Sequence, residues 1–504
     1  MMKKTMRRMA ALLLVCTLCI GAVGCGKGPA QSDPDQASSG PSTPSGGVSG
    51  DPSPSATEDS GDLLTPTKDD RTSATKATSS AATTKYNDGK KDDTSYIKPA
   101  GSKQAQLFGD LRGTKLYISE SDNWFTQNLM KQFKEKYGVE VINYAYSFAE
   151  EQSKLPTIVQ TGDKKNYIDV VTMSSTVALR YIYNGLVMPM DDYLDKTDSA
   201  WNMRGSTVKR FAPYVIGGKT YGSASNSFME DGLFYNKTYM EEIGLTGDKD
   251  PYNLYKAGNW TFKTFLDTAK ACKKMSANGK SVKTYGFASW NYFAFCQTAG
   301  NSVIEQKKDG TWAVTVDRPE GMAGLDVIYE LYQAGTWGNC TAADFAQRKV
   351  AMFVGLPCNV MGAIGGYEVM SDEVGYVPLP KKDKNSPQYV VVCPDGRAIA
   401  SCSQNPRAAA AWIYEFQRAE QVRDESSYGI GNRRQMLSDE HLKIRNDYVK
   451  NGTMLWTMVD GLSNWQTENR GKFLDAIIKD GKTPAAAIDQ MLPLLEDSLR
   501  QTVG

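Results

Sequence analysis

The chain has 504 residues, and its 58 lysines and arginines nearly balance its 57 aspartates and glutamates, for a formal net charge of +1. This balance provides no electrostatic footprint for a polyanion, so we expect no nucleic-acid partner. About 400 residues follow residue 103, more than one hydrophobic core usually serves, so two lobes or domains are expected.

The first 24 residues have the pattern of a secretory signal. Residues 1–9 are rich in lysine and arginine, and an apolar run of about 14 residues follows, too short for a membrane-spanning helix. Ala22-Val23-Gly24-Cys25 resembles the bacterial lipobox, although leucine is usual at the position of Ala22. We therefore predict a lipoprotein signal peptide over 1–24 and lipidation of Cys25 as the first mature residue. The alternative is an ordinary signal peptide, with Cys25 incidental.

Residues 25–103 are dominated by Ser, Thr, Pro, Gly, Asp and Lys, and they contain no Phe or Trp. Such a composition cannot bury enough apolar surface to offset the entropy of ordering the chain. We expect a disordered tether.

The folded part opens with strands that alternate with helices. Runs at 115–119, 139–146 and 168–173 are typical of strands, and a helical pattern ending at Gly138 separates the first two. Alternation of this kind predicts βαβ units and a parallel sheet. Ligands of such sheets bind beyond the carboxyl ends of the strands, so the loops at 119–124 and 173–176 are expected to border a site.

The pattern then repeats in looser form. Further strands are expected at 232–237, 284–290, 349–355, 374–380 and 398–401, with a hairpin turn at Asp309-Gly310 and a chiefly helical tail from about 405. This order favours two α/β lobes that the chain crosses several times.

Catalytic and metal-binding patterns are weak. The single histidine, His441, lies in a polar run that predicts an exposed amphipathic helix, so neither a nucleophile–histidine pair nor a zinc site is favoured. The Asp-Gly-Lys-Thr run at 480–483 lacks the first glycine of a P-loop, and the run at 429–434 fails as a dinucleotide fingerprint. We predict no catalytic residues, no metal and no cofactor.

Six cysteines lie beyond the signal region, and none forms a CxxC pair. Export permits disulfides, but the spacing does not demand them, so we expect mostly free thiols with one or two bridges left open. These residues are Cys272, Cys296, Cys340, Cys358, Cys393 and Cys402.

An ordered set of motifs resembles the extracellular solute-binding proteins of family 1, the maltose-binding-protein-like sugar-capturing lipoproteins of ABC importers. The set begins with "LMKQFKEKYGVEV", "IDVVTMSS" and "YNGLVMPMDDYLD", and it continues with "GGKTYGSASNSFMEDGLFYNK", "RKVAMFVG" and "NPRAAAAWIYEF". The resemblance runs from about residue 110 to the C-terminus.

The resemblance implies a type II periplasmic-binding-protein fold, in which two α/β lobes close on a ligand in a cleft. The chain would cross between the lobes near 224–230, near 374–380 and within 420–437. The implied division places the first lobe at 104–226 and 377–425, the second at 227–376, and a C-terminal helical region, mainly of the second lobe, at 426–504.

The resemblance also suggests which residues contact the ligand. A sugar offers apolar C–H faces to aromatic rings and hydroxyl groups to carboxylates and amides. For each aromatic residue ordinary core packing is the alternative, and for Asp122 and Glu230 it is a plain surface charge. The candidates are Glu120, Asp122, Trp124, Ser174, Ser175, Asn226, Glu230, Trp290, Asn291, Tyr292, Asn359, Trp456 and Trp465.

The sequence thus predicts a non-enzymatic, monomeric, lipid-anchored protein on the outer face of a bacterial cell membrane. It would capture a carbohydrate, with an oligosaccharide favoured, and deliver it to the permease subunits of an ABC importer. A surface glycoside hydrolase, using paired acids such as Asp191-Asp192, and a non-transport structural lipoprotein are the alternatives.

Overall fold

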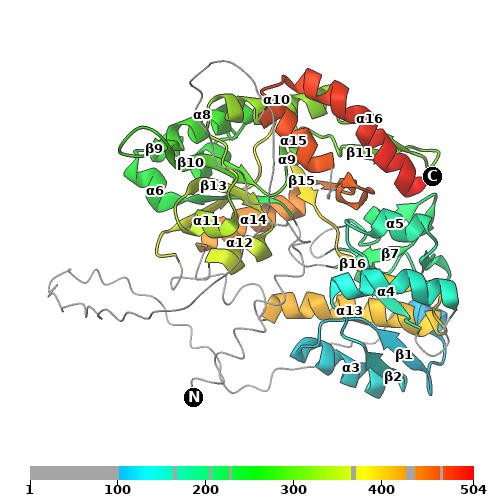
Figure 1. Ribbon diagram of the computed structural model, residues 1–504. Helices are drawn as coiled ribbons and strands as arrows, with labels where there is room; N and C mark the ends of the chain where they lie inside the picture. Colours follow the sequence, from blue (N-terminus) through cyan, green and yellow to red (C-terminus); the bar gives the residue numbers. More distant parts are fainter. Residues whose placement is uncertain are drawn as a thin grey trace, which may run out of the picture. The chain divides into compact units, whose positions relative to one another are not determined.

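A computed structural model describes residues 102–162, 167–203, 207–225, 230–364, 370–426, 437–465, 469–478 and 480–504. The predicted signal peptide and tether, with Cys25, lie outside these ranges. Most of the described strands belong to two mixed β-sheets that carry helices (Figure 1). No helix in the described ranges is long and apolar enough to cross a membrane.

The first sheet has the strand order β2-β1-β3-β16-β4, and β7 also pairs with β16. β1 pairs in parallel with β2 and β3, as predicted, but β16 runs antiparallel to β3, β4 and β7. The predicted parallel pairing of the first three strands is thus confirmed, and the later strand β16 adds antiparallel pairs that the hydrophobic periodicity of a strand does not report. The strands are β1 (Lys115–Ile118), β2 (Glu140–Asn143), β3 (Val170–Thr172), β4 (Val187–Met188), β7 (Gly222–Ala224) and β16 (Gly396–Ala400).

Both faces of the first sheet are buried. Neighbouring residues of a strand point to opposite faces of the sheet, so two buried neighbours report on both faces. Val170 packs in one core cluster with Phe133 and Trp412, whereas Val171 packs in another with Leu155. The first cluster involves α3 and α13, which also contact each other (Figure 1). The helices associated with this sheet are α2 (Ser102–Phe108), α3 (Trp124–Tyr137), α4 (Phe148–Thr161), α5 (Ala178–Tyr183) and α13 (Pro406–Ser426).

Local signals in the sequence set the ends of α3. The Asn123 side chain accepts a hydrogen bond from the backbone N–H of Thr126 at 3.0 Å, which satisfies one of the free donors at the helix start. Gly138 ends the helix with a φ of 66°, a left-handed conformation that glycine adopts without a Cβ penalty. The predicted stop at Gly138 is confirmed.

The second sheet has the strand order β14-β8-β13-β10-β9. β10 and β13 are parallel, while β8 runs antiparallel to β13 and β14. Leu233 and Phe234 in β8 belong to different core clusters, so this sheet is also covered on both faces. The strands are β8 (Gly232–Asn236), β9 (Lys274–Met275), β10 (Val282–Ser289), β13 (Val350–Gly355) and β14 (Val374–Val377).

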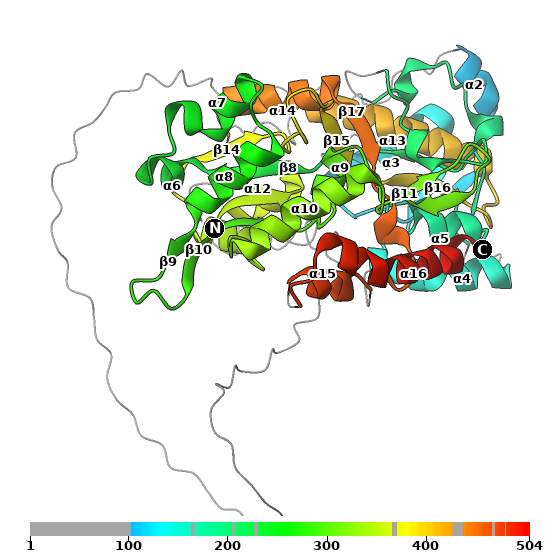
Figure 2. The same cartoon turned by 90° about the horizontal axis from the view of Figure 1, so that it is seen from above.

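Two groups of helices cover the second sheet. Leu233 shares its cluster with Phe265 of α8 and Leu325 of α10, and these two helices contact each other (Figure 2). Phe234 shares its cluster with Phe345 of α11 and Ile444 of α14. The helices are α8 (Phe262–Cys272), α10 (Pro319–Gln333), α11 (Ala342–Ala346), α12 (Pro357–Ile364) and α14 (Asp439–Asn451).

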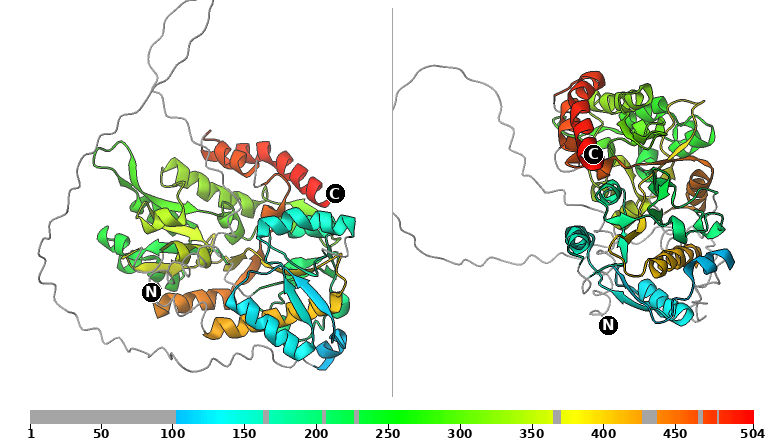
Figure 3. Two further views of the ribbon diagram at one scale, coloured as in Figure 1. Left: turned by 60° about the horizontal axis from the view of Figure 1, so that its bottom comes forward. Right: turned by 90° about the vertical axis from the view of Figure 1, so that its right-hand side faces the viewer.

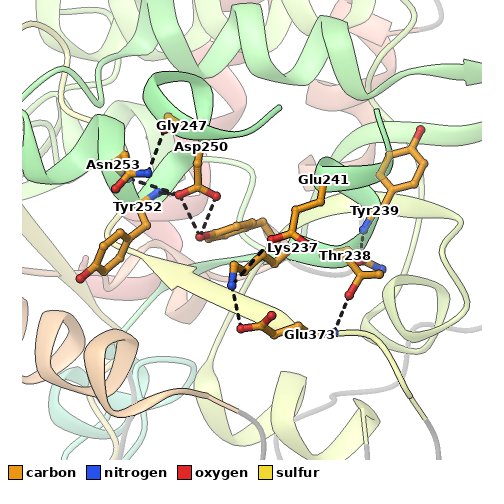
Figure 4. Close-up of polar contacts among 11 residues, drawn as sticks. Lys237, Thr238, Tyr239, Glu241, Gly247, Asp250, Tyr252, Asn253 and Glu373 are labelled. Atoms are coloured by element: carbon orange, nitrogen blue, oxygen red, sulfur yellow. Dashed lines mark hydrogen bonds and ion pairs between the residues drawn. The ribbon is translucent and has the colours of Figure 1, made fainter. Parts of the chain in front are cut away.

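A polar network fastens α6 (Lys237–Glu242) and α7 (Pro251–Lys256) beside the edge strand β14 (Figure 4). Lys237 Nζ lies 2.8 Å from Glu373 Oε1, in the residue before that strand. The Asp250 carboxylate caps α7 by accepting from the backbone N–H of Tyr252 at 2.9 Å. The charged side chains of Lys237 and Asp250 are therefore engaged by protein groups in this network.

The last part of the chain contacts helices that are associated with both sheets. α16 (Pro484–Val503) contacts α5, α10 and α15 (Arg470–Ile478), and its red ribbon is visible in Figure 3. β11 (Ile304–Gln306) and β12 (Trp312–Val314) form the predicted hairpin. The remaining described elements are β5 (Val215–Ile216), β6 (Lys219–Thr220), α9 (Ala294–Thr298), β15 (Tyr389–Val392), β17 (Thr453–Trp456), η1 (Asp191–Tyr193), η2 (Ser199–Trp201), η3 (Ala212–Tyr214), η4 (Gly247–Lys249) and η6 (Val459–Gly461).

His441 corrects one expectation. The predicted helix exists as α14, but its histidine is buried, with Nδ1 2.9 Å from the backbone oxygen of Tyr376 and the ring 5.0 Å from that of Tyr252. Burial lowers the pKa of His441. The residue is therefore a core contact of the second sheet.

Five of the six cysteines outside the signal region have described side chains, and all five are free thiols. Cys272, Cys296 and Cys393 are buried, and burial raises the pKa of the Cys272 thiol to about 12. Such thiols are structural rather than reactive. The side chain of Cys358 is outside the described set.

Candidate functional site

The segment Tyr389–Arg397, which we call the central segment, brings together residues from several parts of the chain. Its first half, β15, pairs in parallel with β17, so that Val392 lies opposite Trp456. Glu230 pairs antiparallel with the same Val392. The predicted residues Glu230 and Trp456 therefore flank one position of the central segment.

The second half of the central segment meets the ends of the first-sheet strands. The Pro394 oxygen accepts a hydrogen bond from the N–H of Ser175 at 2.7 Å, just after β3. The Asp395 oxygen accepts from the N–H of Ser225 at 2.7 Å, just after β7. Because β3 and β7 both run antiparallel to β16, and β1 runs parallel to β3, their carboxyl ends share one edge of the sheet, where ligands of such sheets bind.

An ion pair joins this edge to the end of β1. The guanidinium of Arg397 contacts both carboxylate oxygens of Glu120, with Nη2 2.7 Å from Oε2, and both side chains are largely buried. The guanidinium also lies over the Phe416 ring, 3.3 Å from its centroid. Bidentate pairing of this kind fixes the orientation of both groups.

A second buried ion pair fixes Glu230. Its Oε1 contacts Nε of Arg445 in α14, and both side chains are less than a tenth exposed. Breaking such a pair is unfavourable, because the remaining charge stays buried without its partner. Glu230 is thus a fixed part of the framework around Val392, rather than the plain surface charge considered as an alternative.

Trp290 and Asn291 meet at Asp231, which directly precedes β8. The indole N–H of Trp290 donates to Asp231 Oδ1 at 2.7 Å, and Asn291 Nδ2 donates to Asp231 Oδ2 at 2.6 Å. Asp231 is fully buried, and this burial raises the pKa of its carboxyl to about 7. Two predicted site residues therefore share one carboxylate that the prediction did not include.

The other predicted aromatic residues have separate surroundings. The Tyr292 ring stacks on Trp337 with centroids 6.0 Å apart. Trp124, at the start of α3, is 58% exposed. Trp465 is fully buried and stacks on Phe293 at 5.6 Å, so the structure gives it a core-packing role and leaves no ring face for a ligand.

The remaining candidates include polar residues near the same edge. The Ser174 hydroxyl lies 2.7 Å from that of Thr176, and the exposed Asp122 carboxylate accepts from Gln127 Nε2 at 2.9 Å. Asn226 lies outside the described residues, and so does the side chain of Asn359.

Three charged residues of this arrangement were missed. Arg397 lies in a strand whose other residues are apolar or glycine, and a lone arginine there was a signal for a buried partner. Arg445 lies four residues after His441, on the same face of α14, and Asp231 directly follows a predicted site residue. In sequence Arg445 and Asp231 resemble ordinary surface charges.

The described residues offer no group of three or more His, Cys, Asp and Glu side chains that could hold a metal ion.

Glu151 in α4 is a buried acid beside this edge of the sheet. It is 2% exposed and accepts a hydrogen bond from the backbone N–H of Thr172 at 3.0 Å. Burial raises the pKa of Glu151 to about 8, and burial likewise raises the pKa of Asp395 to about 6. The native state then holds protons that the unfolded state has lost, so the free energy of unfolding falls as pH rises toward 8.

We expect Glu151→Gln to raise the free energy of unfolding at pH 8 by roughly 1–3 kcal/mol, because a glutamine oxygen can accept from Thr172 without a buried charge. Its advantage should shrink as pH falls from 8 to 6.5, because Glu151 then becomes protonated in the native wild type and no longer carries a buried charge. Urea unfolding of wild type and variant between pH 6.5 and pH 8 measures the difference in their free energies of unfolding at each pH. The control is Glu135→Gln on the exposed face of α3, and equal shifts in both variants would contradict the prediction.

Two mixed α/β sheets whose distant segments meet at one connecting segment fit the class of two-lobed solute-binding proteins. Residues 128–433, more than half of the chain, match the family described as bacterial extracellular solute-binding protein. The chain belongs to this family, as its sequence motifs indicated, and the family description implies an extracytoplasmic location.

Solved structures agree on the fold. The chain is similar to a cyclo/maltodextrin-binding protein complexed with maltotetraose, with a TM-score of 0.56 and 19% identity over 76% of this chain and 97% of that chain. It is also similar to a galacto-N-biose/lacto-N-biose I-binding protein of an ABC transporter from Bifidobacterium longum, with a TM-score of 0.55 and 15% identity over 77% of this chain and 96% of that chain. A third similar structure is an ABC substrate-binding protein from Listeria monocytogenes in complex with cycloalternan, with a TM-score of 0.52 and 16% identity over 77% of this chain and 97% of that chain. At these identities the likeness shows a shared fold.

Proposed function

We propose that this protein captures a carbohydrate, with an oligosaccharide favoured, and delivers it to the permease subunits of an ABC importer. The observation that carries the proposal is the convergence of aromatic and polar residues on the central segment: Trp456 and Glu230 pair with Val392, and Trp290 donates to Asp231, whose backbone N–H bonds to Val391. Aromatic faces for C–H surfaces and fixed polar groups for hydroxyls are what a sugar requires.

The proposed ligand contacts keep most of the sequence candidates. Trp290, Tyr292, Trp456 and Trp124 would supply ring surface, and Trp465 is withdrawn because it is buried. The carboxylates of Glu120 and Glu230 are engaged by arginines, so each would act together with its arginine. The remaining proposed contacts are Asp122, Ser174, Ser175, Asn226 and Asn359, whereas the predicted contact Asn291 is withdrawn because Asp231 and Gln297 engage its amide.

The proposal includes the two lobes and the anchor. Strand membership supports lobes at 104–226 with 377–425 and at 227–376, because β1 and β16 share one sheet while β8 and β14 share the other. A lipid on Cys25, followed by the tether at 25–103, would hold a monomer near its importer without enzymatic activity. The intact mass of the mature N-terminal peptide tests the lipid.

A binding screen tests the carbohydrate. The full chain is titrated with maltotetraose, mannobiose and lacto-N-biose, and with a control peptide, while its melting temperature is recorded. A true ligand should raise the melting temperature by mass action on the native state. A rise with the peptide and with none of the sugars would refute the proposed substrate class, and release of sugar products would support the glycosidase alternative.

Trp290→Ala is expected to weaken binding of the best sugar from this panel by about 10–100-fold, because a partly buried aromatic surface is removed. Isothermal titration calorimetry measures the change. The matched control is Trp312→Ala in the distant hairpin strand β12, whose indole N–H donates to the Tyr183 hydroxyl at 2.9 Å. Equal affinities of wild type and Trp290→Ala would remove Trp290 from the site.

A further inference from the structure

The carboxylate of Asp231 holds two side chains that follow β10. Its Oδ1 accepts from the indole N–H of Trp290 at 2.7 Å, and its Oδ2 accepts from Asn291 Nδ2 at 2.6 Å. Its own backbone N–H donates to the oxygen of Val391 in the central segment at 2.8 Å. Asp231 therefore ties the segment after β10 to the central segment.

The amide of Asn291 is committed to the protein framework. Its Nδ2 also donates to Oε1 of the fully buried Gln297 at 2.8 Å, so both of its N–H groups have partners. Its Oδ1 accepts from the backbone N–H of Phe293 at 3.0 Å. Asn291 is thus better suited to shaping this turn than to donating to a sugar.

Trp290 is placed differently. The Asp231 carboxylate occupies its single indole donor, while the side chain stays partly exposed beside the core cluster that contains Phe234 and Phe353. Trp290 can therefore offer a solute only its ring surface. The orientation of the Trp290 ring depends on the Asp231 carboxylate, which accepts the hydrogen bond from its indole N–H.

We propose that Asp231 is a positioning residue for solute capture: it sets the plane of the Trp290 ring and fixes the Asn291 turn without contacting the solute itself. This inference rests on the proposed function, because it takes Trp290 as a wall of the solute site. The role requires two acceptor oxygens facing two donors, which an ionised aspartate provides.

Asparagine at this position keeps the size and loses one acceptor. Its NH₂ group would face either the indole N–H or the Asn291 Nδ2, and two donors cannot share a hydrogen bond. Protonation of Asp231 removes an acceptor in the same way. Several groups influence that protonation: Glu230 on the same segment, which is itself paired with Arg445, Asp460 in η6, and Tyr448 of α14.

The test compares wild type with Asp231→Asn. We expect the variant to bind the best sugar of the panel at least tenfold more weakly at pH 8. Wild-type affinity should fall as pH drops from 8 to 6, because burial raises the pKa of Asp231 to about 7, whereas the variant should lack this dependence. Unchanged affinity at pH 8 would overturn the inference.

A spectroscopic measurement separates positioning from general damage. In the solute-free protein, Asp231→Asn should shift the indole emission and the near-ultraviolet circular dichroism, and the shift should vanish in a Trp290→Phe background. The control is Asp267→Asn on the exposed face of α8, which should change nothing. A shift that persists in the Trp290→Phe background would overturn the inference, because it would come from another tryptophan.

The two proposals can fail separately. If no sugar binds wild type, the carbohydrate proposal fails, while the emission shift still tests the Asp231–Trp290 contact. If sugar binds wild type and Asp231→Asn equally, only the positioning role fails. Should Asp231→Asn not fold, Trp290→Phe, which removes the same hydrogen bond and keeps a ring, is expected to weaken sugar binding at least threefold; unchanged binding overturns the inference.

Discussion

Replacing Arg397 with methionine is expected to lower the free energy of unfolding by about 3–5 kcal/mol, because it leaves the Glu120 carboxylate buried without its partner. The two groups form a bidentate ion pair, and the guanidinium also covers the Phe416 ring. Methionine keeps much of the apolar contact with Phe416, so the loss reports mainly on the stranded charge. Urea unfolding at pH 7 measures it.

A double-mutant cycle isolates the pair. Glu120→Met should be less harmful than Arg397→Met, because Asp395 and Glu420 also attract the guanidinium and remain after Glu120 is removed. The double variant should recover the part of the loss that comes from Glu120, since two apolar side chains can replace a buried ion pair with little net change, while Asp395 and Glu420 still lack the guanidinium. A loss below about 1 kcal/mol for Arg397→Met would contradict a buried, unpaired Glu120.

Gly324→Ala is expected to lower the free energy of unfolding by about 3 kcal/mol, although alanine is normally the better helix residue. Gly324 lies in α10 where this helix meets α9, and a Cβ at this position would lie 2.2 Å from the backbone nitrogen of Cys296. The contact is with backbone, so no side-chain rotation relieves it and the two helices must separate.

A second helical glycine provides the matched control. Gly471 in α15 has open space where a Cβ would project, with no neighbouring atom within 4 Å, so Gly471→Ala should leave the free energy of unfolding unchanged or raise it by up to about 1 kcal/mol. Thermal and urea unfolding of both variants compare the signs directly. If Gly324→Ala is also neutral, the close approach of α9 and α10 is not needed for stability.

The local structure of the first sheet was predictable because its signals are local. Gly138 ends α3 and short apolar runs mark β1 and β3, so the order of elements follows from neighbouring residues. The direction of β16 was not predictable, because its partner β3 lies far away in sequence. Periodicity reports which residues are buried and not which strands pair.

The candidate site was predictable only as a set of loops. The family resemblance assigned Glu230 and Trp290 to one ligand site, but it did not reveal Asp231, because an aspartate beside a glutamate resembles a surface charge. Trp465 shows the opposite error. Tryptophan packs in cores and lines binding sites alike, and only its stacking on Phe293 distinguishes the two roles here.

The central segment also has a consequence for the order of folding. Glu120 and Arg397 are separated by 277 positions, and Val392 is joined to Trp456 still later in the chain. Contacts between such distant residues form only after long loops have closed, which is slow and unfavourable until most of the chain is in place. A chain released before residue 456 would therefore lack this junction, so solute capture would be confined to molecules that have been completed and fully folded.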